Sequence, residues 1–79
     1  MSQKKVVVFS QPGCPPCDTA KAFLSERGID FEVKDVSVDQ QAILELVRTY
    51  NSRSTPTIVV GEQVMIGFDP EQLERMLAE

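Results

Sequence analysis

Hydrophobic and polar positions along the chain switch between the spacing of strands and the spacing of helices. Lys5–Ser10 is a continuous β-branched and aromatic run, which predicts a buried strand. Phe31–Val36 alternates apolar and charged residues, which predicts a strand covered on one face. Thr57–Val60 and Gln63–Ile66 predict two short strands, and the intervening Gly61-Glu62 is typical of a hairpin turn.

Two stretches between these strands have helical spacing instead. The first begins at Cys14 and is expected to stop at Gly28, with its apolar positions at Cys17, Ala20, Phe23 and Leu24. The second is capped by Ser37 or Asp39, and its expected buried stripe consists of Ile43, Leu44, Val47 and Tyr50. Asn51 to Ser54 then forms a polar loop.

The last helix has the clearest start signal in the chain. Asp69 is placed as its N-cap, Pro70 takes the first helical position, and the apolar face is formed by Leu73, Met76 and Leu77. The order β-α-β-α-β-β-α predicts a parallel pair joined through a helix and an antiparallel hairpin. We therefore expect one α/β domain over residues 1–79, with a mixed four-stranded sheet flanked by three helices.

Composition and charge exclude several classes of function. Hydrophobic residues make up 42% of the 79 positions and charged residues 25%, which is an ordinary globular mixture. A net charge of −4 argues against nucleic acid or an anionic membrane as a partner. No stretch approaches the ~20 apolar residues of a membrane span, and Val6–Phe9 is too short for a signal-peptide core. The expectation is a monomer in the cytoplasm.

Cys14 and Cys17 are the two cysteines of the chain. A structural disulfide closing so short a loop restrains the unfolded chain only slightly, so in a cytosolic setting the pair indicates redox chemistry or part of a metal site. A closed zinc site needs about four ligands, and the chain has no histidine. We therefore favour redox chemistry and assign no metal ligand, although a metal bridged across a dimer remains an alternative.

The position of the two cysteines gives each a different role. A sulfur at the helix start meets the positive end of the helix dipole and unpaired N–H groups, which lower the pKa of the Cys14 thiol and make it the nucleophile. Cys17 lies one turn further in, is expected to be less exposed, and can resolve a mixed disulfide. Pro15 suits the first helical position, and Pro16 removes an N–H group, so Cys17 N–H is the nearest remaining donor to the Cys14 sulfur.

Three motifs in the same order resemble the glutaredoxin family: Cys14-Pro15-Pro16-Cys17 at a helix start, Ser54–Thr57 before a strand, and Gly67-Phe68-Asp69 before the last helix. Short bacterial glutaredoxin-like proteins and the redoxins that reduce ribonucleotide reductase look most similar. The resemblance covers nearly the whole chain. It implies a thioredoxin-like fold and a thiol–disulfide oxidoreductase that reduces protein or glutathione mixed disulfides.

The resemblance also implies a substrate site around the cysteines. Pro56 matches a proline that is cis and faces the active-site cysteines, and Thr55 before it offers its backbone to an extended substrate. Asp69 matches a residue that binds the amino group of the γ-glutamyl end of glutathione, although an N-cap needs no ligand to explain it. Gly67 matches the second glycine of a Gly-Gly pair, and Phe68 lies between Gly67 and Asp69.

Other positions depart from the glutathione-using pattern. Gln11 replaces a lysine, and Pro16 replaces a tyrosine, as in the thioredoxin motif. Arg53 is a candidate contact for a glycyl carboxylate, although a solvated loop arginine is the simpler interpretation. The expected substrate-binding set is Gln11, Pro15, Pro16, Arg53, Thr55, Pro56, Gly67, Phe68 and Asp69.

The expected partners follow from the same resemblance. The substrates are disulfide-containing proteins, and the reductant is glutathione or a thioredoxin-reductase-type flavoenzyme. No tightly bound cofactor is expected, with glutathione as a co-substrate. The alternative function is a carrier in which Cys14 and glutathione hold an iron–sulfur cluster between two subunits, an arrangement that the rigid prolines beside Cys14 disfavour.

Overall fold

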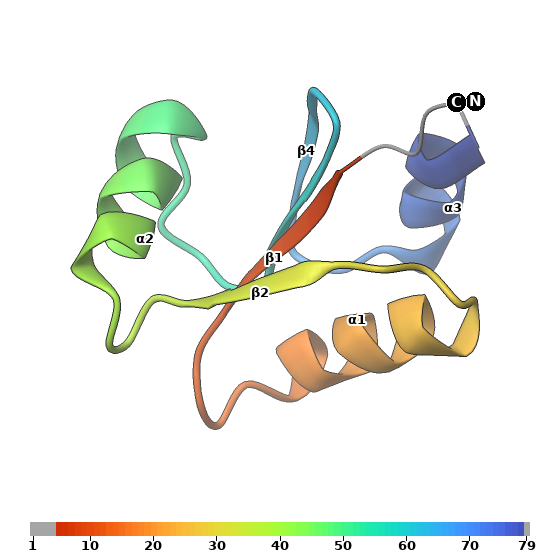
Figure 1. Cartoon of the computed structure of the whole chain (residues 1–79), viewed down its shortest axis with the longest axis horizontal. Helices are drawn as coiled ribbons and strands as arrows, with labels where there is room; N and C mark the ends of the chain where they lie inside the picture. Colours follow the sequence, from red (N-terminus) through yellow and green to blue (C-terminus); the bar gives the residue numbers. More distant parts are fainter. Residues whose placement is uncertain (1–4, 79) are drawn as a thin grey trace.

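The computed structural model describes residues 5–78, so residues 1–4 and 79 of the expected domain lie outside the described part. The elements follow the predicted order, with a short π-helical segment, η1, continuing the second helix (Figure 1). Their bounds are β1 Val6–Ser10, α1 Pro15–Glu26, β2 Glu32–Asp35, α2 Gln40–Leu44, η1 Glu45–Thr49, β3 Thr57–Val60, β4 Gln63–Ile66 and α3 Pro70–Ala78.

The four strands form one mixed sheet in the order β2-β1-β3-β4. β1 and β2 are parallel, as their helical connection requires. β3 runs antiparallel to both β1 and β4. Gly61, at φ 61°, opens the two-residue turn between β3 and β4. The predicted mixed sheet with three flanking helices is confirmed.

Alternate side chains of β1 build two cores, one on each face of the sheet. Val6 and Val8 pack with α1 and α3 on one face, in a cluster completed by Ala20, Leu24, Ile58, Val60, Met65, Leu73 and Met76. Val7 and Phe9 pack on the other face with Val36, Ala42, Leu46 and Val59. Figure 1 shows the corresponding layers, with α1 and α3 on one side of the sheet and α2 on the other. A strand covered on both faces reads as a continuous apolar run, which explains the Val6–Phe9 pattern.

The predicted buried stripe of the second helix is wrong in part. Ile43 and Leu44 are 42% and 47% exposed, whereas Ala42 and Leu46 are buried. Asp39 is the N-cap, and its Oδ1 accepts hydrogen bonds from the N–H groups of Gln41 and Ala42. From this start Ala42 faces the sheet, and the wider turn of η1 carries the buried face on to Leu46 and the half-buried Tyr50.

Three other predicted boundaries each shift by one residue. β1 begins at Val6 instead of Lys5, and β2 is Glu32–Asp35 instead of Phe31–Val36. Val33 is 44% exposed, so its side chain has little cover on this edge strand. No helix within residues 5–78 has the length and apolar character needed to cross a lipid bilayer.

The sheet topology brings segments that are distant in sequence together at one end of the strands. Phe9 near the end of β1 pairs with Thr57 at the start of β3, and Thr57 also pairs with Ile66 at the end of β4. Ser10 pairs with Asp35 at the end of β2. One end of the sheet therefore brings together four loops: those that leave β1, β2 and β4 and the one that enters β3.

Candidate active site

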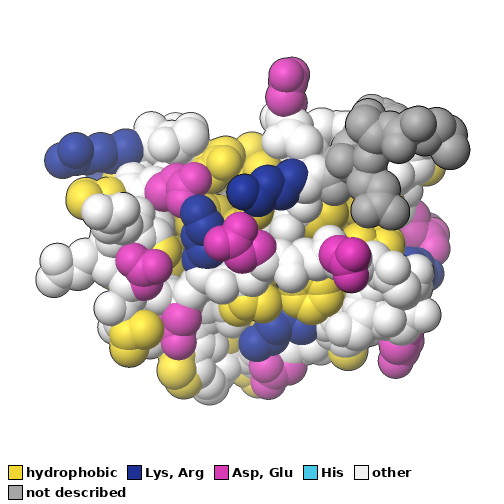
Figure 2. Space-filling view, in the orientation of Figure 1, with side chains coloured by type: hydrophobic (Ala, Val, Ile, Leu, Met, Phe, Trp, Pro, Cys, Tyr) yellow, Lys and Arg dark blue, Asp and Glu magenta, His cyan; other side chains and the backbone are white. Residues whose placement is uncertain are grey.

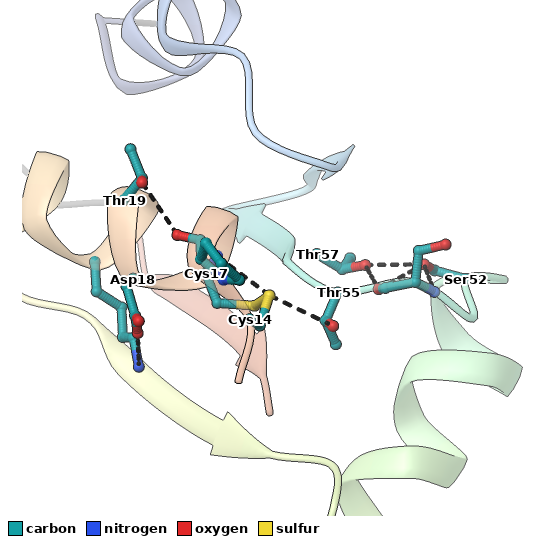
Figure 3. Close-up of a disulfide and its surroundings, with 10 residues drawn as sticks. Cys14, Cys17, Asp18, Thr19, Ser52, Thr55 and Thr57 are labelled. Atoms are coloured by element: carbon teal, nitrogen blue, oxygen red, sulfur yellow. Dashed lines mark hydrogen bonds and ion pairs between the residues drawn. A yellow bond between two sulfur atoms is a disulfide. The ribbon is translucent and has the colours of Figure 1, made fainter. Parts of the chain in front are cut away.

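Cys14 is the N-cap of α1 and is joined to Cys17 by a disulfide (Figure 3). Gly13, at φ 70°, adopts the left-handed conformation that turns the chain out of β1 and into the helix. Pro15 and Pro16 occupy the first two helical positions, where their lack of an N–H group is tolerated. The Cys17 N–H donates to Cys14 Sγ over 3.3 Å, which confirms it as the donor predicted from the sequence.

The two cysteine residues differ slightly in exposure. Cys17 is fully buried, whereas Cys14 retains 7% of its surface. This difference confirms the expected order of exposure. The helix start therefore places a backbone N–H group and the positive end of the helix dipole beside the sulfur of Cys14.

The loop before β3 lies against Cys14. The Thr55-Pro56 peptide bond is cis, as the resemblance implied. The Thr55 hydroxyl donates to Cys14 Sγ over a long 3.9 Å contact, which Figure 3 shows between the labelled side chains. On the other side of the loop, Gly67 N–H donates to the Pro56 carbonyl over 2.7 Å. Thr55 thus contacts the disulfide, and Gly67 is hydrogen-bonded to the neighbouring Pro56.

A buried pair of hydroxyl groups supports the same loop. Ser52 Oγ and Thr57 Oγ1 lie 2.8 Å apart, and Thr57 Oγ1 also donates to the Ser54 carbonyl over 2.7 Å (Figure 3). Ser52 Oγ in turn accepts from Ser54 N–H over 3.3 Å. Only a polar loop was predicted over Asn51 to Ser54, without this buried pair. The local signal for it was the density of short hydroxyl residues, which bond readily to nearby backbone.

A groove of about 480 Å³ opens beside Thr55. Three predicted binding residues, Gln11, Arg53 and Thr55, line it together with Ser54. The remaining lining residues were not predicted, and they are apolar: Val36, Ile43, Leu46 and Val47. They come from the end of β2 and from α2 with η1, so only the tertiary arrangement shows that they share a wall.

The other predicted binding residues lie in different surroundings. Pro15 and Pro16 are exposed on the first turn of α1. Phe68 is half-buried and packs edge-on against Phe23, with ring centroids 5.6 Å apart. Asp69 caps α3, because its Oδ1 accepts from the N–H groups of Glu71 and Gln72.

Two charged side chains of β2 have local hydrogen-bond partners. Lys34 Nζ donates to Glu45 Oε1 over 2.6 Å, and this hydrogen bond raises the pKa of Lys34 above its ordinary value. The Ser37 hydroxyl and then the Ser37 N–H lower the pKa of Asp35, which both groups hydrogen-bond. Within residues 5–78, no three histidine, cysteine or acidic side chains gather in an arrangement that could hold a metal ion.

Known proteins with the same arrangement are glutaredoxins and their relatives. The family model for glutaredoxin matches residues 6–65. The Gene 56 protein of Mycobacterium phage L5 is 33% identical over 73 residues, which cover 91% of this chain and 71% of that protein. The fold also matches the crystal structure of the thioredoxin-like protein BC3987, at 41% identity and a TM-score of 0.89, over 92% of this chain and all of that one.

A third relative connects this chain to a specific redoxin type. The structure of NrdH-redoxin from Escherichia coli, a glutaredoxin-like protein with a thioredoxin-like activity profile, has a TM-score of 0.79 and 27% identity. The match covers 90% of this chain and 92% of that one. Together with the Cys14–Cys17 pair at a helix start, these similarities show that the chain belongs to the glutaredoxin family and is a thiol–disulfide oxidoreductase with a thioredoxin-like fold.

Proposed function

We propose that the chain reduces disulfides in proteins, and mixed disulfides with glutathione, by a dithiol mechanism. The observation that carries this proposal is the asymmetry of the pair. Cys14 lies at the start of α1 and retains 7% of its surface, and Cys17 lies one turn further in and is fully buried. Cys14 is accordingly the nucleophile, and Cys17 is the resolving thiol.

The reaction proceeds by two exchange steps. The Cys14 thiolate attacks one sulfur of the substrate disulfide, a Cys14–substrate disulfide forms, and the other substrate sulfur leaves as a thiolate that takes up a proton. The Cys17 thiol loses its proton and attacks Cys14 Sγ, which releases the second substrate sulfur and leaves the Cys14–Cys17 disulfide. Two electrons pass to the substrate, and a reductant must restore both thiols.

Two reductants fit the proposal: glutathione, as a co-substrate, and a thioredoxin-reductase-type flavoenzyme. Gln11 and Pro16 depart from the glutathione-using pattern, which favours the flavoenzyme. The thioredoxin-like activity profile of the related Escherichia coli NrdH-redoxin supports the same choice. No tightly bound cofactor takes part in the proposed cycle. A coupled NADPH assay with either glutathione and its reductase or thioredoxin reductase separates the two donors, and we expect faster turnover with the latter.

Trapping experiments test the two cysteine roles. In Cys17→Ser the first exchange step proceeds and the second cannot, so a protein substrate should accumulate as a disulfide on Cys14. Cys14→Ser is the matched control, because it retains one cysteine but removes the proposed nucleophile. Equal trapping by the two variants would refute the assigned roles, and trapping by neither would refute the mechanism.

A further inference from the structure

Thr55 links the groove to the disulfide. Thr55 lines the groove and also places its hydroxyl on Cys14 Sγ. Because Cys14 keeps only 7% of its surface, a substrate disulfide must come close to react. The residues that flank the substrate cysteine are then pressed against the adjoining surface. The groove volume of about 480 Å³ exceeds the space that one cysteine side chain fills and falls among ordinary ligand sites.

One wall of the groove is polar and held in place. It consists of Gln11 and the segment Arg53 to Thr55. The Ser52–Thr57 hydroxyl pair fixes that segment from behind through its bonds to Ser54. The backbone at Ser54 in this wall is therefore held in place before a ligand binds.

The opposite wall is apolar and partly open to solvent. Ile43, at 42% exposure, lies in it with Val47, and Ile43 also borders a second hollow of about 240 Å³ with Leu44 and Gln40. Figure 2 shows hydrophobic side chains at the surface over α2 and the loop before it. Glutathione has no large apolar side chain and would leave this wall uncovered. A polypeptide with an apolar residue near its cysteine would cover it.

Arg53 supplies the charge of the groove. Its side chain is exposed, and among residues 5–78 it takes part in none of the ion pairs. The chain as a whole has a net charge of −4, and Arg53 is a cation in the groove whose lining residue Thr55 contacts Cys14 Sγ. Its natural complement is a carboxylate on the substrate.

We propose that this groove is a specificity site for protein substrates. The segment that carries the target disulfide lies extended along the groove, with a large apolar side chain against Ile43 and Val47 and a carboxylate at Arg53. In an extended segment, the residues two positions from the cysteine point to the same side as the cysteine. The inference rests on the proposed function, because it requires attack by Cys14.

Peptide mixed disulfides with thionitrobenzoate test the site. Attack of Cys14 on the peptide sulfur forms the Cys14–peptide disulfide, breaks the peptide–thionitrobenzoate disulfide and releases coloured thionitrobenzoate. Two peptides are compared. One carries leucine two residues before and two residues after the cysteine, and the other carries serine at both positions. For the unmodified protein, we expect kcat/KM to be about 10-fold higher with leucine.

Variants assign the preference to the groove. Ile43→Gln should reduce the leucine preference to about 2-fold or less, since its apolar contact is lost. Val33→Gln is the matched control, because Val33 is 44% exposed on the edge strand β2 and should leave the preference unchanged. In a second pair of peptides, one carries aspartate where the other carries asparagine, and the unmodified protein should prefer aspartate. Arg53→Gln should abolish this preference. Reduction of the small disulfide 5,5′-dithiobis(2-nitrobenzoate) should proceed at the same rate in Val33→Gln and in the unmodified protein.

Three results would overturn the inference. Equal rates for the leucine and serine peptides, with the small disulfide still reduced, would reject the groove and leave the proposed function intact. Failure to reduce the small disulfide would reject the proposed function and the groove with it. A dimer in sedimentation that Ile43→Gln converts to a monomer would show that a second copy of the chain covers this wall instead.

Discussion

Ser52 Oγ and Thr57 Oγ1 face each other at 2.8 Å inside the protein, where their residues are 2% and 0% exposed. Between them in sequence lie Arg53, Ser54, Thr55 and the cis Pro56. The pair closes the base of the loop whose tip contacts Cys14 Sγ. A structural hydrogen bond thus supports the segment that contacts Cys14 Sγ, which connects the stability of this loop to the proposed function.

Thr57→Val tests this connection, since it keeps the shape of the side chain and removes the hydroxyl. The bonds to Ser52 and Ser54 are lost. We expect the free energy of unfolding to fall by about 1–3 kcal/mol, the cost of leaving buried polar groups unsatisfied. KM for protein disulfides should rise more than kcat falls. Thr57→Ser restores the hydroxyl and should recover KM, and a variant that loses stability with KM unchanged would show that the pair is only structural.

Thr55→Val tests the contact between the Thr55 hydroxyl and Cys14. In the reduced protein, a hydroxyl donor beside the sulfur favours the thiolate. Alkylation of Cys14 by iodoacetamide at constant pH should therefore slow by a factor of about 2 to 10, less than a short charge-assisted bond would give, because the contact is 3.9 Å long. Thr49→Val changes an exposed threonine of η1 and serves as the control. Unchanged alkylation in Thr55→Val would mean that this hydroxyl does not act on the sulfur.

The elements and the cysteine geometry could be predicted because their signals are local. A β-branched run, a proline at a helix start and a glycine after a helix each act on their own neighbours. The Cys17 donor followed from counting the N–H groups that Pro15 and Pro16 remove. The cis state of Pro56 needed the family resemblance, because sequence alone favours trans.

The features that could not be predicted depend on tertiary contacts or on an irregular helix. The buried face of α2 and η1 was misplaced because the expected stripe assumed an α-helical period, whereas η1 is wider. That error hid the exposure of Ile43 and Leu44 and therefore the apolar wall of the groove. The Ser52–Thr57 pair joins a loop residue to the first residue of β3 and depends on the path of the chain between them.

Ser37→Ala tests the pH dependence of the turn between β2 and α2. Hydrogen bonds from Ser37 hold the pKa of Asp35 below its ordinary 3.8. A carboxyl group whose pKa is lowered by folding stabilises the folded protein at pH values above its unfolded-state pKa. This stabilisation is lost as the pH falls through the folded-state pKa. Ser37→Ala should therefore lower the free energy of unfolding at neutral pH, and the difference from the unmodified protein should shrink below pH 3.8. Urea unfolding at several pH values measures this difference in the free energy of unfolding. Ser25→Ala, at an exposed position of α1, should show a difference independent of pH.

Asp69→Asn separates two functions that the same carboxylate can serve. As the N-cap of α3, Asp69 accepts from Glu71 and Gln72, and asparagine caps helices equally well. Asp69→Asn should therefore keep the melting temperature, whereas Asp69→Ala should lose about 1 kcal/mol of stability. If the carboxylate also binds the amino group of glutathione, Asp69→Asn should raise KM for a glutathione mixed disulfide by about 3-fold, as expected for an exposed ion pair. The same substrate made with N-acetylated glutathione lacks that charge, so its KM should not respond to Asp69→Asn. If KM for the glutathione mixed disulfide is the same in Asp69→Asn and in the unmodified protein, Asp69 only caps the helix.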